Sequence, residues 1–475
     1  MNDYENDTNK LKNNIRHLLQ LKELDQAKTL LDKYENTMPQ EPEFYVLRAL
    51  LSIQSDHYDD AWLWLWRGIE KYPDHTNLHF HMGFVCECLN KYQDTLLHYR
   101  YTKNLTNDKN LKDKMDTKIS EVHAKLKESS ADEAKPLRVL QGTMEIANQM
   151  NVLSKGLQSL GILSKTLSYY DFYLGYSSDY TWNLAKEQND KNLNARLKKL
   201  TNKLMSQYNI FHFHFGTTLT LDGADLEMLN RANKSLFMQH WGSEVRFYSQ
   251  ARKLNPYAKA KVMNEESIKY RLERLSKHIR HCFVADRELH EYVKNFYENV
   301  YIIPSMIDLS MYQPEENTTL HPKPLIVHAP TSQEIKGTKY ILQAVEHLKS
   351  HYEFDFQLVH GMSHKEAMEI YRKADIIIDQ LHIGSYGLFA VECMAMGKPV
   401  ICWISDYMRD NYPEDLPIIS ANPDNVVNKL EYVLQNQDML PEIGRQGRKY
   451  VERYHDMLTN SKEILRIYEA VESLS

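Results

Sequence analysis

A four-residue pattern that returns at intervals of 34 residues is the feature that most constrains how this chain can fold. The pattern joins a large residue to two polar residues and a small one, in Leu24-Asp25-Gln26-Ala27, Tyr58-Asp59-Asp60-Ala61 and Tyr92-Gln93-Asp94-Thr95. Pro39 and Pro73 share the interval, and each would end a helix because proline lacks a backbone donor. A repeat of this length predicts a stack of helical hairpins.

The sizes of the side chains support this interpretation. Ala27 and Ala61 stand where two helices of a hairpin must approach closely. Ala61, Trp64, Leu65 and Gly68 follow the i, i+3, i+4, i+7 spacing of a buried helix face. The pattern resembles the tetratricopeptide repeat, whose period is 34 residues.

The resemblance implies an all-α module over residues 1–130. Three units would run over about 9–106, a charged helix over 110–126 would cap them, and residues 129–134 would form a linker. Such stacks build extended surfaces that bind peptides or other proteins. The module is therefore predicted to hold an acceptor or a protein partner, with self-association as the alternative. Trp62 and Trp66, one helical turn apart, either pack against a neighbouring repeat or domain or bind a partner.

From Lys135 onward, short apolar runs alternate with amphipathic helices, which is typical of parallel sheets. Ten runs are expected as strands, at 137–140, 166–169, 210–215, 235–238, 281–284, 300–303, 324–329, 354–359, 374–378 and 399–402. Gln141-Gly142-Thr143 is expected as a turn, and residues 147–160 are expected as a helix that ends at Gly161.

The runs fall into two sets, which predicts an α/β fold with two Rossmann-like domains, over residues 135–315 and 316–475. Two such domains place a ligand in the cleft between the carboxyl ends of their sheets. The last segment, from Met439 to the C-terminus, is expected as helices long enough to cross back over that cleft.

Composition narrows the classes of function. The net charge of -6, from 58 Lys and Arg against 64 Asp and Glu, argues against a nucleic-acid partner. An acidic start, and no apolar run near the roughly 20 residues that span a bilayer, predict a cytoplasmic protein without a transmembrane segment. A peripheral association with a membrane surface stays open. The five scattered cysteines predict reduced thiols, because neither a disulfide framework nor a zinc cluster fits their spacing.

The strongest chemical signal is the stretch from Gly387 to Val400, Gly-Leu-Phe-Ala-Val-Glu-Cys-Met-Ala-Met-Gly-Lys-Pro-Val. Gly387 permits close approach of the backbone just before a helix, and the free amides there, including that of Leu388, can bind a diphosphate. Glu392 projects from the same helix and can accept hydrogen bonds from two ribose hydroxyls. Gly397 ends the helix and turns the chain into a strand.

This stretch resembles the family-4 retaining glycosyltransferases, also called glycosyl transferases group 1, which have the GT-B fold. The resemblance extends from about Lys135 to the C-terminus. Lys336-Gly337-Thr338 is similar to the family's Lys-Gly after the first strand of the C-terminal domain. The resemblance implies that Lys336 neutralises the donor diphosphate and stabilises charge on the leaving group.

Two further motifs carry the resemblance into the N-terminal half. The segment His240-Trp241-Gly242-Ser243-Glu244 is similar to the family's His-Gly-Ser-Asp, with an inserted tryptophan and glutamate for aspartate. It implies that His240 contacts the transferred sugar or its phosphate. Residues 302–308 are similar to the interdomain segment Val-Ile-Pro-Asn-Gly-Val-Asp.

His212 and His214 share one face of an expected strand, because side chains alternate with period two. His212 is expected in the packed core, whereas His214, nearer the carboxyl end, is open to either a core or a cleft position. A metal site would need a third ligand at suitable spacing, and the sequence shows none.

Two positions depart from the family pattern. Gly384 stands where the family usually has a glutamate that contacts the sugar ring, eight residues before Glu392. Thr331 stands where the family usually has a phosphate-binding arginine, five residues before Lys336. Lys339 is a candidate replacement for that arginine.

The resemblance implies a metal-independent hexosyltransferase that moves a sugar from a nucleoside diphosphate sugar, its co-substrate, to a protein or cell-surface glycan with retention at the anomeric carbon. No separate cofactor is expected. Lys336 and His240 are the expected catalytic residues, and Glu392, Gly387, Leu388 and Lys336 are the expected donor-binding residues. The alternatives are a non-catalytic GT-B partner subunit, which the two departures favour, and a sugar-nucleotide epimerase.

Overall fold

The chain folds into two compact units. The computed structural model describes residues 2–37, 41–129, 136–170, 176, 178–187, 189–314, 321 and 323–473, so Pro39 and most of the expected linker lie outside the described residues. One unit comprises residues 1–136, 192–209 and 222–234, and the other comprises 137–191, 210–221 and 235–475.

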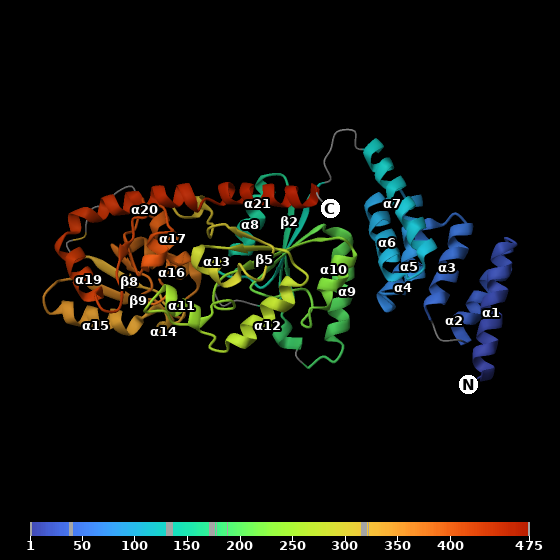
Figure 1. Ribbon diagram of the computed structural model, residues 1–475, viewed down its shortest axis with the longest axis horizontal. Coiled ribbons are helices and arrows are strands. Elements are labelled where there is room, and N and C mark those ends of the chain that lie inside the picture. Colours follow the sequence, from blue (N-terminus) through green and yellow to red (C-terminus); the bar gives the residue numbers. More distant parts are fainter. Residues whose placement is uncertain are drawn as a thin grey trace. The chain divides into compact units, whose positions relative to one another are not determined.

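A helical region precedes the first strand (Figure 1). Its helices are α1 (Asn2–Gln20), α2 (Leu24–Thr37), α3 (Pro42–Gln54), α4 (Tyr58–Lys71), α5 (Thr76–Cys88), α6 (Tyr92–Leu105) and α7 (Lys109–Ser129). The even-numbered helices α2, α4 and α6 begin at Leu24, Tyr58 and Tyr92, at the interval of the sequence pattern. The predicted helical N-terminal region is thus confirmed, and its assignment to the tetratricopeptide class stays a prediction.

The helices of this region approach one another closely. Ala61 is fully buried, and a Cβ built on Gly68 would lie 2.7 Å from Cδ2 of Leu78, which leaves no room for a side chain. The rings of Trp62 and Trp66 stack with centroids 5.3 Å apart and planes 8° apart. Both rings pack against the apolar core of the helices, which supports the packing interpretation of the pair.

The first unit includes two helices from beyond residue 130, namely α9 (Leu193–Gln207) and α10 (Ala224–Arg231). The hydroxyl of Tyr101 donates a hydrogen bond to the carbonyl of Met228 at 2.9 Å. The side-chain amide of Asn104 donates to the carbonyl of Arg231 at 2.6 Å. These bonds from α6 join segments more than 100 residues apart, so the unit does not end where the sequence repeat ends.

The second unit contains a seven-stranded parallel sheet in the order β3-β2-β1-β4-β5-β6-β7. Its strands are β1 (Arg138–Thr143), β2 (Leu163–Ser168), β3 (Tyr180–Thr181), β4 (Ile210–His214), β5 (Ser235–His240), β6 (His281–Val284) and β7 (Asn299–Ile302). Gln141-Gly142-Thr143, predicted as a turn, instead continues β1, because these residues pair with 166–168 of β2.

A five-stranded parallel sheet in the order β12-β11-β10-β8-β9 follows in the same unit. Its strands are β8 (Leu325–His328), β9 (Asp355–Leu358), β10 (Ile376–Ile378), β11 (Val400–Cys402) and β12 (Ile419–Ser420). Neighbouring residues along a strand join different apolar cores, as Ile326 and Val327 do, because side chains alternate across a sheet. The two predicted parallel sheets are therefore confirmed.

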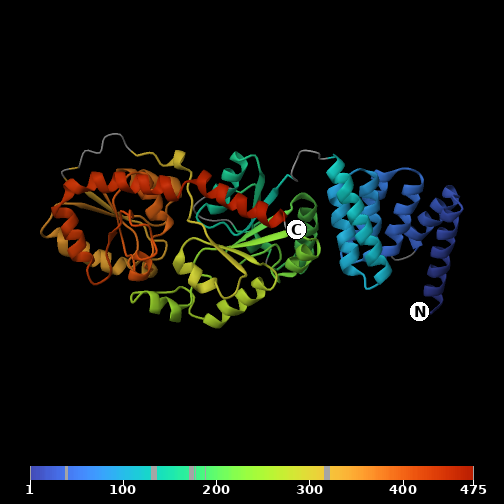
Figure 2. The same cartoon turned by 45° about the horizontal axis from the view of Figure 1, so that its top comes forward.

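Further helices and short turns connect the strands of both sheets or follow the last strand, β12. They are α8 (Gln149–Ser159), α11 (Tyr248–Leu254), α12 (Glu265–Ser276), α13 (Arg287–Val293), α14 (Gln333–Lys336), α15 (Thr338–Lys349), α16 (His364–Lys373), α17 (Leu388–Ala395), α18 (Asp406–Arg409), α19 (Val426–Gln435), α20 (Leu440–Tyr454) and α21 (Met457–Ser473), with 3-10 turns at Leu184–Glu187, Leu309–Met311 and Gln437–Met439. Helix α20 lies along the five-stranded domain, and α21 continues along the seven-stranded one (Figures 1 and 2).

Helix α21 supplies part of the core of the seven-stranded domain. Its Tyr468 is fully buried beside Phe237 and Phe283, and the Tyr468 and Phe237 ring centroids are 4.7 Å apart. The Tyr468 hydroxyl and Nδ1 of His212 are hydrogen-bonded at 2.5 Å. The last helix of the chain is thus an integral layer of the domain that begins at residue 137.

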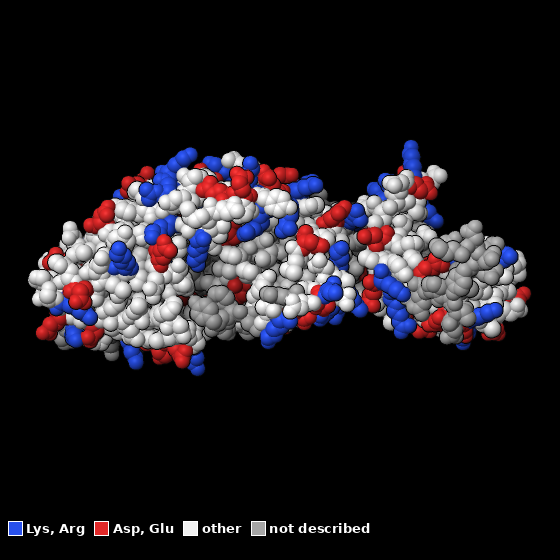
Figure 3. All heavy atoms as spheres, turned by 90° about the horizontal axis from the view of Figure 1, so that it is seen from below, with Lys and Arg blue, Asp and Glu red and all other residues white. Residues whose placement is uncertain are grey.

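The surface carries charges of both signs. Figure 3 shows Lys and Arg side chains interspersed with Asp and Glu over the described part of the face that it draws. Among the described helices, none has both the length and the apolar composition needed to cross a bilayer.

Candidate active site

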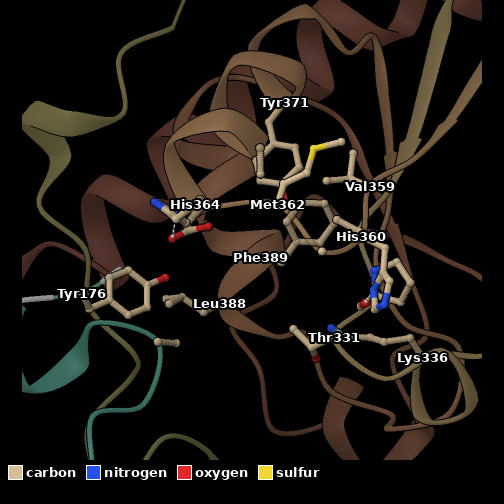
Figure 4. Close-up of a pocket in the computed structure, with 16 residues that line it drawn as sticks. Tyr176, Thr331, Lys336, Val359, His360, Met362, His364, Tyr371, Leu388 and Phe389 are labelled. Carbon is tan, nitrogen blue, oxygen red and sulfur yellow. Dashed lines mark hydrogen bonds and ion pairs between the residues drawn. The ribbon is translucent and has the colours of Figure 1, made fainter. Parts of the chain in front are cut away.

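A cavity of about 240 Å³ lies at the carboxyl ends of strands β8 and β9, beside the start of helix α17. Most of its lining comes from the five-stranded domain, and Ala147 and Tyr176 of the seven-stranded domain complete it. Figure 4 shows Tyr176 on the side of the cavity opposite Lys336. The lining residues are Ala147, Tyr176, Ala329, Pro330, Thr331, Lys336, Val359, His360, Gly361, Met362, His364, Ala367, Tyr371, Leu388, Phe389 and Glu392.

Lys336 is held at one wall of this cavity by a buried carboxylate. Its Nζ lies 2.5 Å from Oδ1 of Asp379, which directly follows β10 and whose side chain is fully buried. The amide of Gly387 donates to Oδ2 of the same carboxylate at 3.2 Å. Asp379 therefore fixes both the ammonium group and the start of α17, and it partly neutralises the lysine before any ligand binds.

Glu392 lies at another wall and is also buried. Its Oε1 accepts a hydrogen bond from the Tyr312 hydroxyl at 2.8 Å and lies 3.1 Å from Nε2 of His364. The hydrogen bond to Glu392 raises the pKa of His364. Burial, followed by the negative charge of Glu392, raises the pKa of Tyr312. Both of these contacts use Oε1, so they leave Oε2 for a ligand hydroxyl.

The remaining wall is largely apolar. Val359, Gly361 and Met362 lie in the loop that follows β9. On the facing helices, the rings of Tyr371 and Phe389 pack with centroids 4.8 Å apart. Figure 4 shows Thr331 and Lys336 together on one side of the cavity, His364 on another, and Leu388 between them.

The structure separates the predicted site residues. Lys336, Leu388 and Glu392 line the cavity, whereas Gly387 lines a second cavity of about 310 Å³ together with Tyr386 and His455. The predicted free amide of Gly387 is occupied by Asp379.

His240 lines neither cavity and is fully buried. Its Nε2 is hydrogen-bonded to the Tyr297 hydroxyl at 2.8 Å, and its Nδ1 lies 3.4 Å from Glu244. Glu244 also accepts hydrogen bonds from the amides of Trp241 and Gly242, at 2.6 Å and 2.9 Å. The motif after β5 therefore builds a packed turn, and contact between His240 and a sugar would require this turn to rearrange.

His212 and His214 lie in the core. Their rings stack 4.6 Å apart, and Nε2 of His214 is bonded to Oε1 of Gln141 at 2.9 Å. Burial lowers the pKa of His214 to about 3, and it lowers that of His212 as well. Of the two positions considered for His214, the structure favours the core. Within the described ranges, no group of three His, Cys, Asp or Glu side chains is placed to hold a metal ion.

The surroundings of Gly384 explain, in steric terms, why this position has no glutamate as the family pattern usually does. Its φ of +83° is a conformation that favours glycine, and a Cβ there would lie 2.7 Å from Nδ2 of Asn255 and 3.0 Å from Cβ of Ser405. The Asn255 amide instead donates to the carbonyl of His382 at 2.8 Å. A glutamate side chain cannot enter at position 384 without displacing Asn255.

We expect Gly384→Ala to lower the free energy of unfolding by roughly 2–4 kcal/mol, because it adds backbone strain and a steric clash. Gly161→Ala is the matched control, since Gly161 has a φ of +81° but a Cβ there meets nothing within 4 Å. Urea unfolding followed by circular dichroism measures both changes. Equal losses in the two variants would show that contact with Asn255 adds nothing.

The chain is similar to a family of known sequences and to known structures. Residues 339–466 match the family described as glycosyl transferase-like. Sucrose-phosphate synthase from Thermosynechococcus elongatus aligns with a TM-score of 0.53 and 13% identity over 71% of this chain and 100% of its own. A glycosyltransferase from Rickettsia africae aligns with a TM-score of 0.52 and 14% identity over 72% of this chain and 100% of its own. No curated protein sequence matches the chain.

The two structural similarities confirm the predicted GT-B arrangement of the sheets. Sequence reasoning missed Asp379, His364 and Tyr312 as parts of the site. A charged residue directly after the apolar run Ile376-Ile377-Ile378 was a signal for Asp379. Tyr312 and His364 carried no signal, because they reach Glu392 from separate segments 80 and 28 residues away.

Proposed function

We propose that this chain is a glycosyltransferase that binds a nucleoside diphosphate sugar in the cavity beside α17 and transfers the sugar to a protein or cell-surface glycan with retention. The observation that carries the proposal is that Lys336 and Glu392 line one cavity. Glu392 lies within the segment that matches a glycosyl transferase-like family, and Lys336 lies just before that segment. A cation for a diphosphate and a carboxylate for ribose hydroxyls are the groups that such a donor needs.

Each wall has a part in the proposed complex. The base lies against the apolar wall of Val359, Met362 and Phe389, the ribose hydroxyls donate to Glu392, and the diphosphate lies at Lys336. The bond from the anomeric carbon to the diphosphate breaks, and a bond to the acceptor oxygen forms on the same face of the sugar. The acceptor proton moves to the leaving phosphate oxygen, whose charge Lys336 stabilises. The proposed reaction uses no metal ion.

Glu392→Gln should weaken binding of the free nucleoside diphosphate by about 1–3 kcal/mol, because the ribose hydroxyls lose a charged acceptor. Calorimetric titration with uridine and guanosine diphosphates measures the loss. Glu369→Gln, which changes an exposed glutamate of α16, should leave the affinity unchanged. An unaltered affinity of Glu392→Gln would remove Glu392 from the ribose site.

The nature of the reaction separates this proposal from its alternatives. Incubation with labelled nucleotide sugars and no acceptor should give slow hydrolysis by a transferase and interconversion of sugars by an epimerase. Tight binding without turnover would instead identify a non-catalytic subunit, the alternative that the steric exclusion at Gly384 favours. The helical region is proposed to hold the acceptor or a protein partner.

A further inference from the structure

A loop from the seven-stranded domain reaches the five-stranded domain beside the cavity. This bridging loop, residues 255–261, is the first part of the connection between α11 and α12. The side-chain amide of Asn255 donates a hydrogen bond to the backbone carbonyl of His382. Nδ1 of the His382 ring lies 3.0 Å from the backbone carbonyl of Tyr257. The hydroxyl of Tyr257 also donates to Asp424. The loop is therefore fixed to the opposite domain along its length.

The second half of the bridging loop is basic and faces the helix that carries Lys336. Nζ of Lys259 lies 3.1 Å from Oε1 of Glu334, and Glu334 and Lys336 both belong to the four-residue helix α14. Lys261 follows Lys259 by two residues in the same loop. Desolvation is the largest cause that lowers the pKa of Lys261, and the positive charges of Lys336 and Arg246 lower it further.

The three cations of this region, Lys336, Arg246 and Lys261, differ in whether they have a counter-ion. Lys336 has Asp379 as its counter-ion, and Arg246 forms two hydrogen bonds to Glu288, at 2.8 Å and 3.0 Å. Lys261 is only partly exposed and has no ion pair with any residue that the structure describes. A cation held near two others without its own counter-ion raises the free energy of the empty site, and a bound anion removes that cost.

We propose that Lys261 binds the diphosphate of the donor from across the cleft, so that one lysine from each domain holds the same anion. The assignment deepens the proposed function and rests on it. It also accounts for the threonine at position 331, where the family pattern usually has an arginine. The second positive charge then comes from the opposite domain rather than from the loop after β8. Because Asp379 already offsets the charge of Lys336, a nucleoside diphosphate needs this second cation to be held tightly.

Calorimetric titration tests the assignment with five probes: uridine diphosphate, guanosine diphosphate, uridine, guanosine and inorganic pyrophosphate. Lys261→Ala should weaken binding of the diphosphate probes by about ten- to a hundredfold, the usual worth of a charge-assisted hydrogen bond. It should leave binding of the nucleosides within about twofold. Lys261→Arg should retain most of the affinity, because the charge is kept.

Lys269→Ala is the matched control, since it removes the same charge from an exposed position on α12. An equal loss in this control, or unchanged diphosphate affinity in Lys261→Ala, overturns the assignment. Equal weakening of nucleosides and diphosphates by Lys261→Ala overturns it too, because the lysine would then act through the fold. If the unaltered protein binds pyrophosphate through Lys261 but no nucleotide, the anion site stands and the proposed function fails. Failure to bind pyrophosphate or any diphosphate overturns both.

Discussion

Replacing Lys336 by alanine should lower the rate of sugar transfer by about 10²–10³-fold, the usual loss when one group that stabilises leaving-group charge is removed. Binding of a nucleoside without phosphates should hardly change, because the charge acts on the diphosphate. Steady-state kinetics with a labelled donor, together with titration of the nucleoside, measure the two effects separately.

The substitution has a structural side effect that needs its own control. Removing Lys336 leaves the carboxylate of Asp379 fully buried without its cation, which costs about 3–5 kcal/mol in comparable buried pairs. The double variant Lys336→Ala with Asp379→Asn should recover most of this stability and none of the lost rate. Recovery of the rate in the double variant would mean that Lys336 serves only to neutralise Asp379.

Tyr468→Ala should lower the free energy of unfolding by about 3–5 kcal/mol, because it opens a cavity between Phe237 and Phe283 and removes the partner of His212. Tyr468→Phe keeps the packing and loses only the hydroxyl, so it should cost about 1–2 kcal/mol. Urea unfolding measures both. Similar small losses in the two variants would contradict the integral position of α21.

Apolar periodicity predicted most of the fold because long buried strands carry a strong pattern. The run Ile210-Phe211-His212-Phe213-His214 is buried throughout and could only be a central strand. The two-residue edge strands at Tyr180–Thr181 and Ile419–Ser420 are too short to produce a pattern. Gly142 misled the prediction, since glycine is more common in turns than within a buried strand.

The candidate site could be predicted where its functional residues lie close together in the sequence. Gly387, Leu388 and Glu392 stand within six residues on one helix start, so their spacing alone indicated a nucleotide site. The groups that set the charge of this site come from separate segments. Asp379 approaches from a strand end and Lys261 from the other domain, and no single-sequence pattern joins them to Lys336.

The packing of α21 also determines when the seven-stranded domain can finish folding during synthesis. Strand β7 leaves the ribosome about 170 residues before Tyr468, a delay of roughly ten to thirty seconds at ordinary elongation rates. Throughout that interval the apolar face with Phe237 and Phe283 lacks its final cover. A premature stop codon between β7 and α21 would release a protein that contains every strand of the first sheet but leaves this apolar face uncovered, and exposed apolar surface of this kind favours aggregation.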